Sequence, residues 1–144
     1  MSDFEMDGGD RSDERSVGLD VPAELGYSDE HVWVGQSEGL LSLGITEYAA
    51  DHMGDLVYVD LPEVGTRFDV GDELVQLESS KAVQPVIAPV AGTVRHVNGE
   101  VAEDPEIVNN DPYGEGWMVK VEPEDDEPEL LDDGQYRNLL RKSK

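Results

Sequence analysis

Lys81 is the residue of this sequence whose setting points most clearly to chemistry. It lies in the segment LESSKAVQPVIAPVAGTV and is the one charged residue between Ser79 and Val94. It is also the first of four lysines in the chain. An exposed turn lysine usually contributes only its charge, but an enzyme that modifies one lysine is helped when no competing amine lies nearby. The setting therefore favours a covalent modification site at Lys81.

The other chemistry-bearing residues form no recognisable catalytic or metal-binding pattern. The chain contains no cysteine, which excludes a disulfide framework, a thiolate metal site and a thiol nucleophile. His31, His52 and His96 have no spacing that would assemble a metal site with neighbouring acids, so we expect no metal. As a lone histidine, His52 is expected to be structural or to line a cleft. Trp33 and Trp117 are expected to anchor the core or a loop.

Composition and charge limit the classes of protein to which this chain can belong. The chain has 144 residues, 34 acids and 10 bases, for a formal net charge of −24. Phosphate binding needs clustered Lys and Arg, so we expect no nucleic-acid partner. We read the acidity as a solvated surface, with an acidic patch for one basic partner as the alternative. No apolar run approaches the ~20 residues of a membrane span, and no targeting segment is recognisable, so we expect a cytoplasmic protein without a membrane partner.

The pattern of elements predicts a mainly β protein with minor helices. Short Val-, Leu- and Ile-rich runs alternate with turn residues from Tyr27 to Val121, which is typical of a compact β sandwich or barrel. The segment 46–54 predicts a short helix, because Thr46 is suited to the N-cap and Gly54 to the C-cap. A loop of Asn, Asp, Pro and Gly precedes a closing strand expected from Trp117 to Val121.

The predicted interior consists of apolar residues on alternating strand positions. Two prolines, at 85 and 89, should confine their stretch to an edge strand or a bulge. The residues expected in the core are Val32, Val34, Leu41, Leu43, Ile45, Val57, Val59, Val75, Leu77, Val86, Val90, Val94, Trp117, Val119 and Val121. This composition is ordinary for a packed domain.

Several blocks of the sequence resemble one known family. They are LGITEYAADHMGDLVYVDLPEVGT, ESSKA, APVAGTVRHVN and IVNNDPYGEGWMVKVEP, which occur in this order. An acid–small–x–Lys–Ala turn is common to lipoyl domains in general, whereas the first and last blocks are far more specific. From about Tyr27 to Pro123, the chain resembles the H protein of the glycine cleavage system, a lipoyl carrier protein.

The resemblance implies a fold, a cofactor and partners. The fold is a barrel-sandwich hybrid of the lipoyl- and biotinyl-carrier type, with lipoate joined to Lys81 at a hairpin tip as N6-lipoyllysine. The arm would take the aminomethyl group of glycine from the decarboxylating glycine dehydrogenase to the aminomethyltransferase, and dihydrolipoyl dehydrogenase would reoxidise it. A lipoate ligase or lipoyltransferase would attach the cofactor. The protein itself would be a non-catalytic carrier, and we expect a monomer.

Composition along the chain and the extent of the resemblance together suggest how the chain is divided. We expect an acidic flexible arm at residues 1–20, a lipoyl-binding domain at 21–126, and an acidic tail with a C-terminal helix at 127–144. His52, Glu30 and Glu78 are the candidate residues for a cleft that shelters the loaded arm. Their side chains would lie near a cationic aminomethyl amine, which carboxylates stabilise.

The chain departs from the family pattern near the site. The family usually reads His-Glu-Trp where this chain reads His31-Val32-Trp33, and it places an acid where this chain has Pro85. Ser80 replaces a branched apolar residue. Because the changes at Val32 and Pro85 remove carboxylates, we expect a weaker hold on the aminomethylated arm.

Other functions stay open on the sequence. A divergent carrier could serve another lipoate-dependent complex or a lipoate relay, and an unmodified interaction module would result if the hairpin changes block the attaching enzyme. A biotin carrier normally brackets its lysine with methionines, whereas Ser80 and Ala82 flank Lys81. An acyltransferase lipoyl domain would lack the ITEYAADHMGD and NNDPYGEGW blocks.

Overall fold

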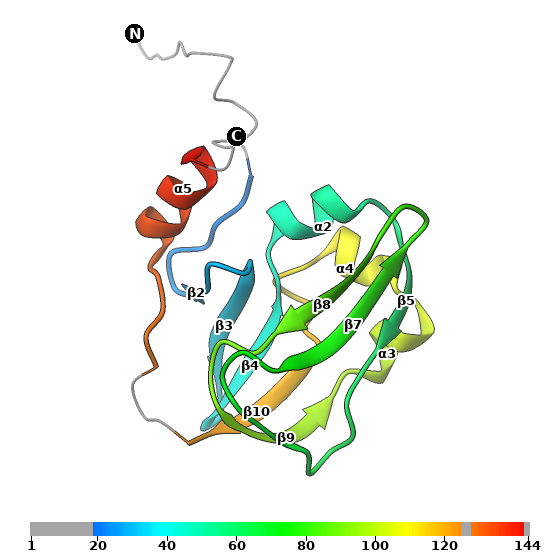
Figure 1. The fold of residues 1–144 in the computed structure, drawn as a ribbon, viewed down its shortest axis with the longest axis vertical. Helices are drawn as coiled ribbons and strands as arrows, with labels where there is room; N and C mark the ends of the chain where they lie inside the picture. Colours follow the sequence, from blue (N-terminus) through cyan, green and yellow to red (C-terminus); the bar gives the residue numbers. More distant parts are fainter. Residues whose placement is uncertain (1–18, 125–127, 143–144) are drawn as a thin grey trace, which may run out of the picture.

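The protein is built from two β-sheets with four short helices around them, in a computed structural model that describes residues 19–124 and 128–142 (Figure 1). The larger sheet has the strand order β2-β3-β4-β10-β9-β6, and the smaller has the order β5-β7-β8. The strands are β2 (Gly26–Tyr27), β3 (Val32–Ser37), β4 (Leu40–Ile45), β5 (Leu56–Asp60), β6 (Arg67–Phe68), β7 (Glu73–Ser79), β8 (Val83–Ile87), β9 (Gly92–Val97) and β10 (Val119–Pro123). The helices are α2 (Glu47–Met53), α3 (Gly99–Glu103), α4 (Glu106–Asn110) and α5 (Asp133–Lys142).

The expected mainly β fold is confirmed, and its hairpins follow from local turn chemistry. β3 and β4 pair antiparallel, with Ser37 opposite Leu40. Glu38 and Gly39 between them both have positive φ, 54° and 85°. Two left-handed residues form the hairpin turn whose twist matches that of the strands.

One main core joins the inward faces of both sheets. Val34, Leu43 and Val119 from the larger sheet share a buried cluster with Val75, Leu77 and other residues of the smaller sheet. Each buried Val or Leu side chain contributes about 1.5–3 kcal/mol to stability, so this cluster is the main force that holds the sheets together.

Two residues expected in this core are placed elsewhere. Val57 is 60% exposed, because the pairing of β5 with β7 shifts register between Leu56 and Tyr58. This bulge turns two successive side chains outward and leaves Leu56 and Val59 as the buried ones. Trp117 is half-buried and lies before the closing strand, which begins at Val119 instead of Trp117.

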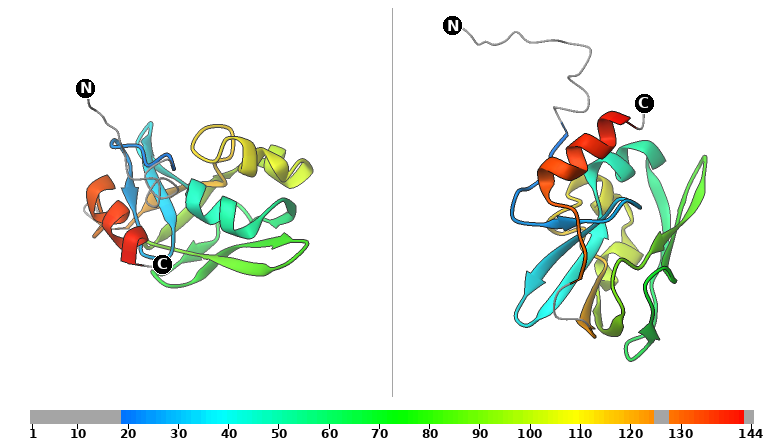
Figure 2. Two further views of the ribbon diagram at one scale, coloured as in Figure 1. Left: turned by 90° about the horizontal axis from the view of Figure 1, so that it is seen from above. Right: turned by 60° about the vertical axis from the view of Figure 1, so that its left-hand side comes forward.

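The C-terminal segment packs on the larger sheet. Leu131 exchanges two backbone hydrogen bonds with Tyr27, and α5 follows directly. Tyr136 and Leu140, one helical turn apart, are buried in a second cluster that includes Val21 and Tyr27. Figure 2 shows α5 beside β2, on the opposite side of the molecule from the β7–β8 hairpin. The division of the chain at 20/21 and 126/127 stays a prediction, and residues 1–18 lie outside the described residues.

Candidate functional site

Lys81 lies in a tight turn at the tip of the β7–β8 hairpin. Ser79 donates its backbone N–H to the carbonyl of Ala82 at 2.8 Å. The hydroxyl of Ser79 accepts hydrogen bonds from the backbone N–H groups of Lys81 and Ala82, at 3.3 and 3.2 Å. Ser79 is buried, whereas Ser80 and Lys81 are exposed. The turn is therefore held from inside by Ser79, and it presents Lys81 to solvent.

The Lys81 side chain lies against the end of helix α2, which the green hairpin faces in Figure 1. A Cβ atom placed on Gly54 would be 3.2 Å from Lys81 Cε and 3.7 Å from its Nζ. Gly54 is the C-cap of α2, as expected, and its φ of 78° and ψ of −165° lie in a backbone region that glycine adopts and other residues avoid. The C-terminal end of a helix carries partial negative charge, which favours a nearby ammonium group.

Asn109 holds the Gly54 segment in place. Its amide nitrogen donates to the carbonyls of Gly54, at 2.9 Å, and Ala50, at 3.4 Å. Its amide oxygen accepts the backbone N–H of Leu56 at 2.9 Å. Asn109 thus ties the end of α2 to the start of β5, directly beside Lys81. Asn109 lies in the NNDPYGEGW block, but no role for it was predicted from the sequence.

The candidate cleft residues Glu78 and His52 lie on two different elements. Glu78 is half-buried on β7, opposite Tyr58 on one side and Val83 on the other. His52 is exposed on α2, and its ring packs on Tyr48 with centroids 4.1 Å apart. Their role toward a loaded arm stays a prediction.

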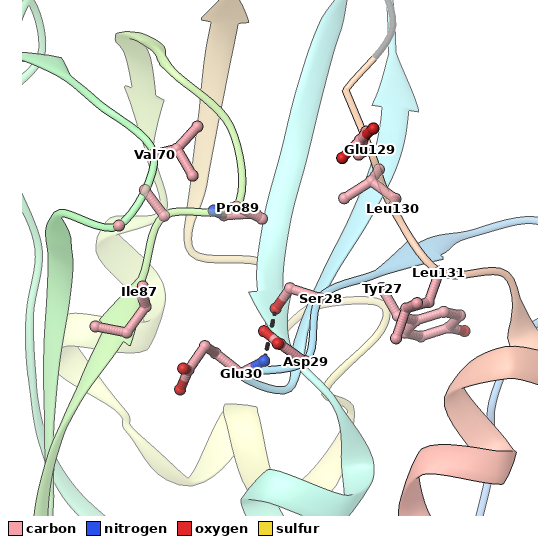
Figure 3. Close-up of a pocket in the computed structure, with 12 residues that line it drawn as sticks. Tyr27, Ser28, Asp29, Glu30, Val70, Ile87, Pro89, Glu129, Leu130 and Leu131 are labelled. Carbon is pink, nitrogen blue, oxygen red and sulfur yellow. Dashed lines mark hydrogen bonds between the residues drawn. The ribbon is translucent and has the colours of Figure 1, made fainter.

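Glu30, the third candidate, lies in a separate pocket of about 470 Å³. Figure 3 shows the pocket between the end of the β8 segment and the C-terminal segment, with Glu30 and Asp29 on the loop that precedes β3. Lys81, His52 and Glu78 are not among the described residues that line it. Among the described residues, Glu30 therefore lines a pocket to which the other two candidates do not contribute.

His31 contacts both helix α5, through Tyr136, and helix α2, through the ring of Tyr48. Its Nδ1 lies 2.8 Å from the hydroxyl of Tyr136, which lies 2.7 Å from the hydroxyl of Thr46, the N-cap of α2. Burial lowers the pKa of His31, and the nearby His52 lowers it further. Burial raises the pKa of Tyr136, so its hydroxyl stays protonated. These contacts of His31 were not predicted from the sequence.

The positions that depart from the family pattern differ in their burial. Val32 is fully buried in the main core, opposite Ile45 on β4. Pro85 is exposed on β8, an edge strand, as expected for a proline in a sheet. Ser80 is exposed in the turn. A weaker hold on an aminomethylated arm stays a prediction.

The described residues offer neither a metal cluster nor a membrane-spanning helix. Across residues 19–124 and 128–142, His, Asp and Glu form no group of three or more that could hold a metal ion. None of the helices in these ranges has the length and apolar content of a membrane span.

The fold and the hairpin lysine together define a carrier domain of the lipoyl type. The family model of the glycine cleavage H-protein matches residues 25–143. The H protein of Bifidobacterium longum strain NCC 2705 is 59% identical over 132 residues, which cover 92% of this chain and 96% of that protein. The H protein of Thermobifida fusca strain YX is 46% identical, over 84% of this chain and 96% of its own length.

A solved structure shows the same likeness in three dimensions. A crystal structure of a glycine cleavage system H protein from Mycobacterium marinum superposes with a TM-score of 0.80 at 35% identity. The match covers 84% of this chain and 99% of that one. The chain therefore belongs to the glycine cleavage H-protein family, the carrier component of the glycine cleavage system.

Proposed function

We propose that Lys81 is the residue that carries lipoate, as N6-lipoyllysine, and that the protein shuttles the aminomethyl group of glycine on this arm. The carrier would receive the group from the decarboxylating glycine dehydrogenase and deliver it to the aminomethyltransferase. Dihydrolipoyl dehydrogenase would act on the arm afterwards, and a lipoate ligase or lipoyltransferase would attach it. The observation that carries this proposal is the exposed Lys81 in a turn of defined geometry within the ESSKA sequence.

The residues around Lys81 fit a tethered cofactor. The turn is braced from its buried side by Ser79, so the Lys81 backbone has a fixed position while its side chain is exposed. Lipoate, when bound, supplies a dithiol that carries the aminomethyl group, and the protein contributes tether and recognition. Lysine and lipoate together give a tether on the order of 10 Å. Lys81 can therefore serve partners that dock at different places.

Glu78 and His52 support a sheltering role through their positions. Glu78 lies on the same hairpin as Lys81, and His52 lies two residues before Gly54, on which the Lys81 stem rests. A carboxylate near the cationic amine of the loaded arm would stabilise it through a charge-assisted hydrogen bond, about 1.5–3 kcal/mol. Glu30 and Asp29 offer further carboxylates in their pocket. A non-catalytic role and a monomeric state also belong to this proposal, and the cytoplasmic location stays a prediction.

Intact-mass measurement of the protein purified from its native host tests the modification. We expect a gain of about 188 Da, the mass that a lipoyl amide adds. Lys81→Arg should abolish the gain, because guanidinium keeps the charge but offers no acylatable amine. Lys120→Arg is the matched control and should retain the gain. A mass gain that persists in Lys81→Arg, or its absence from the native protein, would refute the proposal.

A further inference from the structure

Exposed apolar side chains gather near the Lys81 turn. Five large hydrophobic residues are exposed in the described part of the chain, and three of them lie on β5 and β8 beside the hairpin tip. These are Val57, Tyr58 and Val83, which are 60, 50 and 58% exposed. The other two, Val64 and Val70, lie in the connections on either side of β6. A clustered apolar surface on a highly charged protein indicates an interaction site.

Strand register places a set of these residues on one face of the smaller sheet. Tyr58 on β5 lies opposite Glu78 on β7, which lies opposite Val83 on β8. Pro85 lies opposite Gln76, two residues farther along, so it shares this face. We call Tyr58, Glu78, Val83 and Pro85 the tip face. The neighbouring Leu77 points to the core, so the tip face is the outer surface of the sheet.

The edge of this sheet is less suited to a partner than its face. β8 is an edge strand, and edge strands can pair with a strand of another protein. Pro85 in the middle of β8 has no N–H to donate, which disfavours such pairing. A partner that approaches the hairpin is therefore expected to contact the tip face.

The distance to Lys81 decides which partner this face suits. Val83 is two residues from Lys81 in the chain, so their Cα atoms lie at most about 7 Å apart. An enzyme that acylates Lys81 must hold the bare amine in its active site, so it must cover the residues around the tip. Enzymes that meet the finished arm can dock farther away, because the tether extends their reach.

The charged residues around the tip face further limit the kind of enzyme that can dock there. In residues 55–60 and 73–83 the charged residues besides Lys81 are Asp55, Asp60, Glu73 and Glu78. An enzyme with an apolar contact patch and a basic rim would complement this surface.

We propose that the tip face is the docking surface for the enzyme that attaches the lipoyl group, a proposal that rests on the modification of Lys81. In that reaction an amide bond forms between Lys81 Nζ and the carbonyl carbon of an activated acyl donor, a mixed anhydride or thioester. The leaving group departs with its electron pair, and the ammonium group of Lys81 releases two protons. Tyr58 and Val83 supply the apolar contact, and Glu78 faces a cation of the enzyme.

The test measures acylation of the full-length unmodified protein by a purified lipoate ligase with lipoate and ATP. Val83→Ser should raise the KM for the carrier, and Tyr58→Ser combined with Val83→Ser should lower kcat/KM about tenfold or more, as expected for interface anchors. Val64→Ser is the matched control, because Val64 is also 58% exposed but lies outside the tip face. It should change kcat/KM less than about twofold. Glu78→Lys should lower kcat/KM most at low salt, because screening weakens charge pairing.

Two further measurements make the result specific. Acetylation of Lys81 by a small reagent should be equal in the Val83→Ser, Tyr58→Ser/Val83→Ser and Val64→Ser variants, which separates docking from amine reactivity. Aminomethyl uptake from the decarboxylating glycine dehydrogenase, on already lipoylated Val83→Ser and Tyr58→Ser/Val83→Ser variants, should change little.

The proposal would be overturned by an unchanged kcat/KM in the double variant, by an equal loss in Val64→Ser, or by a loss confined to aminomethyl uptake. Lipoylation of the native protein alone tests the proposed function. A lipoylated native protein with insensitive tip-face variants would refute the docking surface while leaving the proposed function intact.

Discussion

The stem of Lys81 rests on Gly54: Lys81 Cε lies 3.2 Å from the position that a Cβ of residue 54 would take. The two residues belong to different elements, the β7–β8 turn and the C-terminal cap of α2. This contact couples the lysine to the helix end that Asn109 holds.

Gly54→Ala should destabilise the protein and free the Lys81 side chain. Gly54 has φ 78° and ψ −165°, a region that side chains avoid at a cost of about 1–3 kcal/mol. Gly65→Ala is the control, because Gly65 also has positive φ but a Cβ added there would meet nothing within 4 Å. Denaturant unfolding should show a lower free energy of unfolding in both variants than in the native protein. Only Gly54→Ala should speed reagent acetylation of Lys81, and equal acetylation rates would show that the Gly54 contact does not restrain the lysine.

Asn109→Ala should lower the free energy of unfolding by about 2–4 kcal/mol, because the hydrogen bonds to Gly54, Ala50 and Leu56 are lost in a half-buried site. Asn109→Asp keeps an acceptor for Leu56 N–H but loses the donor to the two carbonyls, so it should also be destabilised. Asn110→Ala, at the exposed neighbouring position, is the control for helix propensity in α4. Urea unfolding of the three variants provides the measurement. If Asn110→Ala lowered the free energy of unfolding as much as Asn109→Ala, this would contradict the role of Asn109 in holding the Gly54 segment.

Stability should fall in mildly acidic solution because His31 charges. Its pKa is lowered in the folded protein, chiefly by burial and then by His52, while Asp29 acts in the opposite direction. The unfolded chain therefore binds the proton more readily, so the contribution of neutral His31 is complete above pH ~6.5 and declines as pH falls below that value.

Comparison with His31→Asn isolates this effect from the titration of carboxylates. Asn tolerates the positive φ of 69° at this position but does not titrate. The free energy of unfolding, measured from pH 8 to pH 5, should fall more steeply in the native protein than in the variant. Parallel curves would mean that His31 titrates alike in the folded and unfolded states.

Removal of residues 1–18 should leave the melting temperature nearly unchanged, because we expect so acidic and weakly apolar a sequence to bury too little surface to offset its ordering entropy. Extension of the deletion through Val21 should lower the melting temperature. Val21 is buried in the second cluster, and the carbonyl of Asp20 accepts the Tyr113 hydroxyl at 2.6 Å. Scanning calorimetry at high salt distinguishes the two truncations. A large drop in the melting temperature when only residues 1–18 are removed would show that these residues contribute to the fold.

Local patterns in the sequence determined much of this protein. The Glu38–Gly39 turn, the Thr46 and Gly54 caps and the edge position of Pro85 each follow from the chemistry of a few adjacent residues. Lys81 could be found in the same way, because its isolation in an apolar hairpin segment is visible along the chain. These features depend on backbone preferences that act over one turn or one strand.

Only the tertiary structure decided the relationships between distant segments. Asn109 donates a hydrogen bond to Gly54, 55 residues away in the chain. The hydroxyl of Tyr136 contacts the ring of His31, 105 residues away. The outward turn of Val57 depends on how β5 pairs with β7, which a two-residue alternation cannot reveal. Such contacts depend on chain closure and on the pairing of whole strands, so the residue types at either end do not determine them.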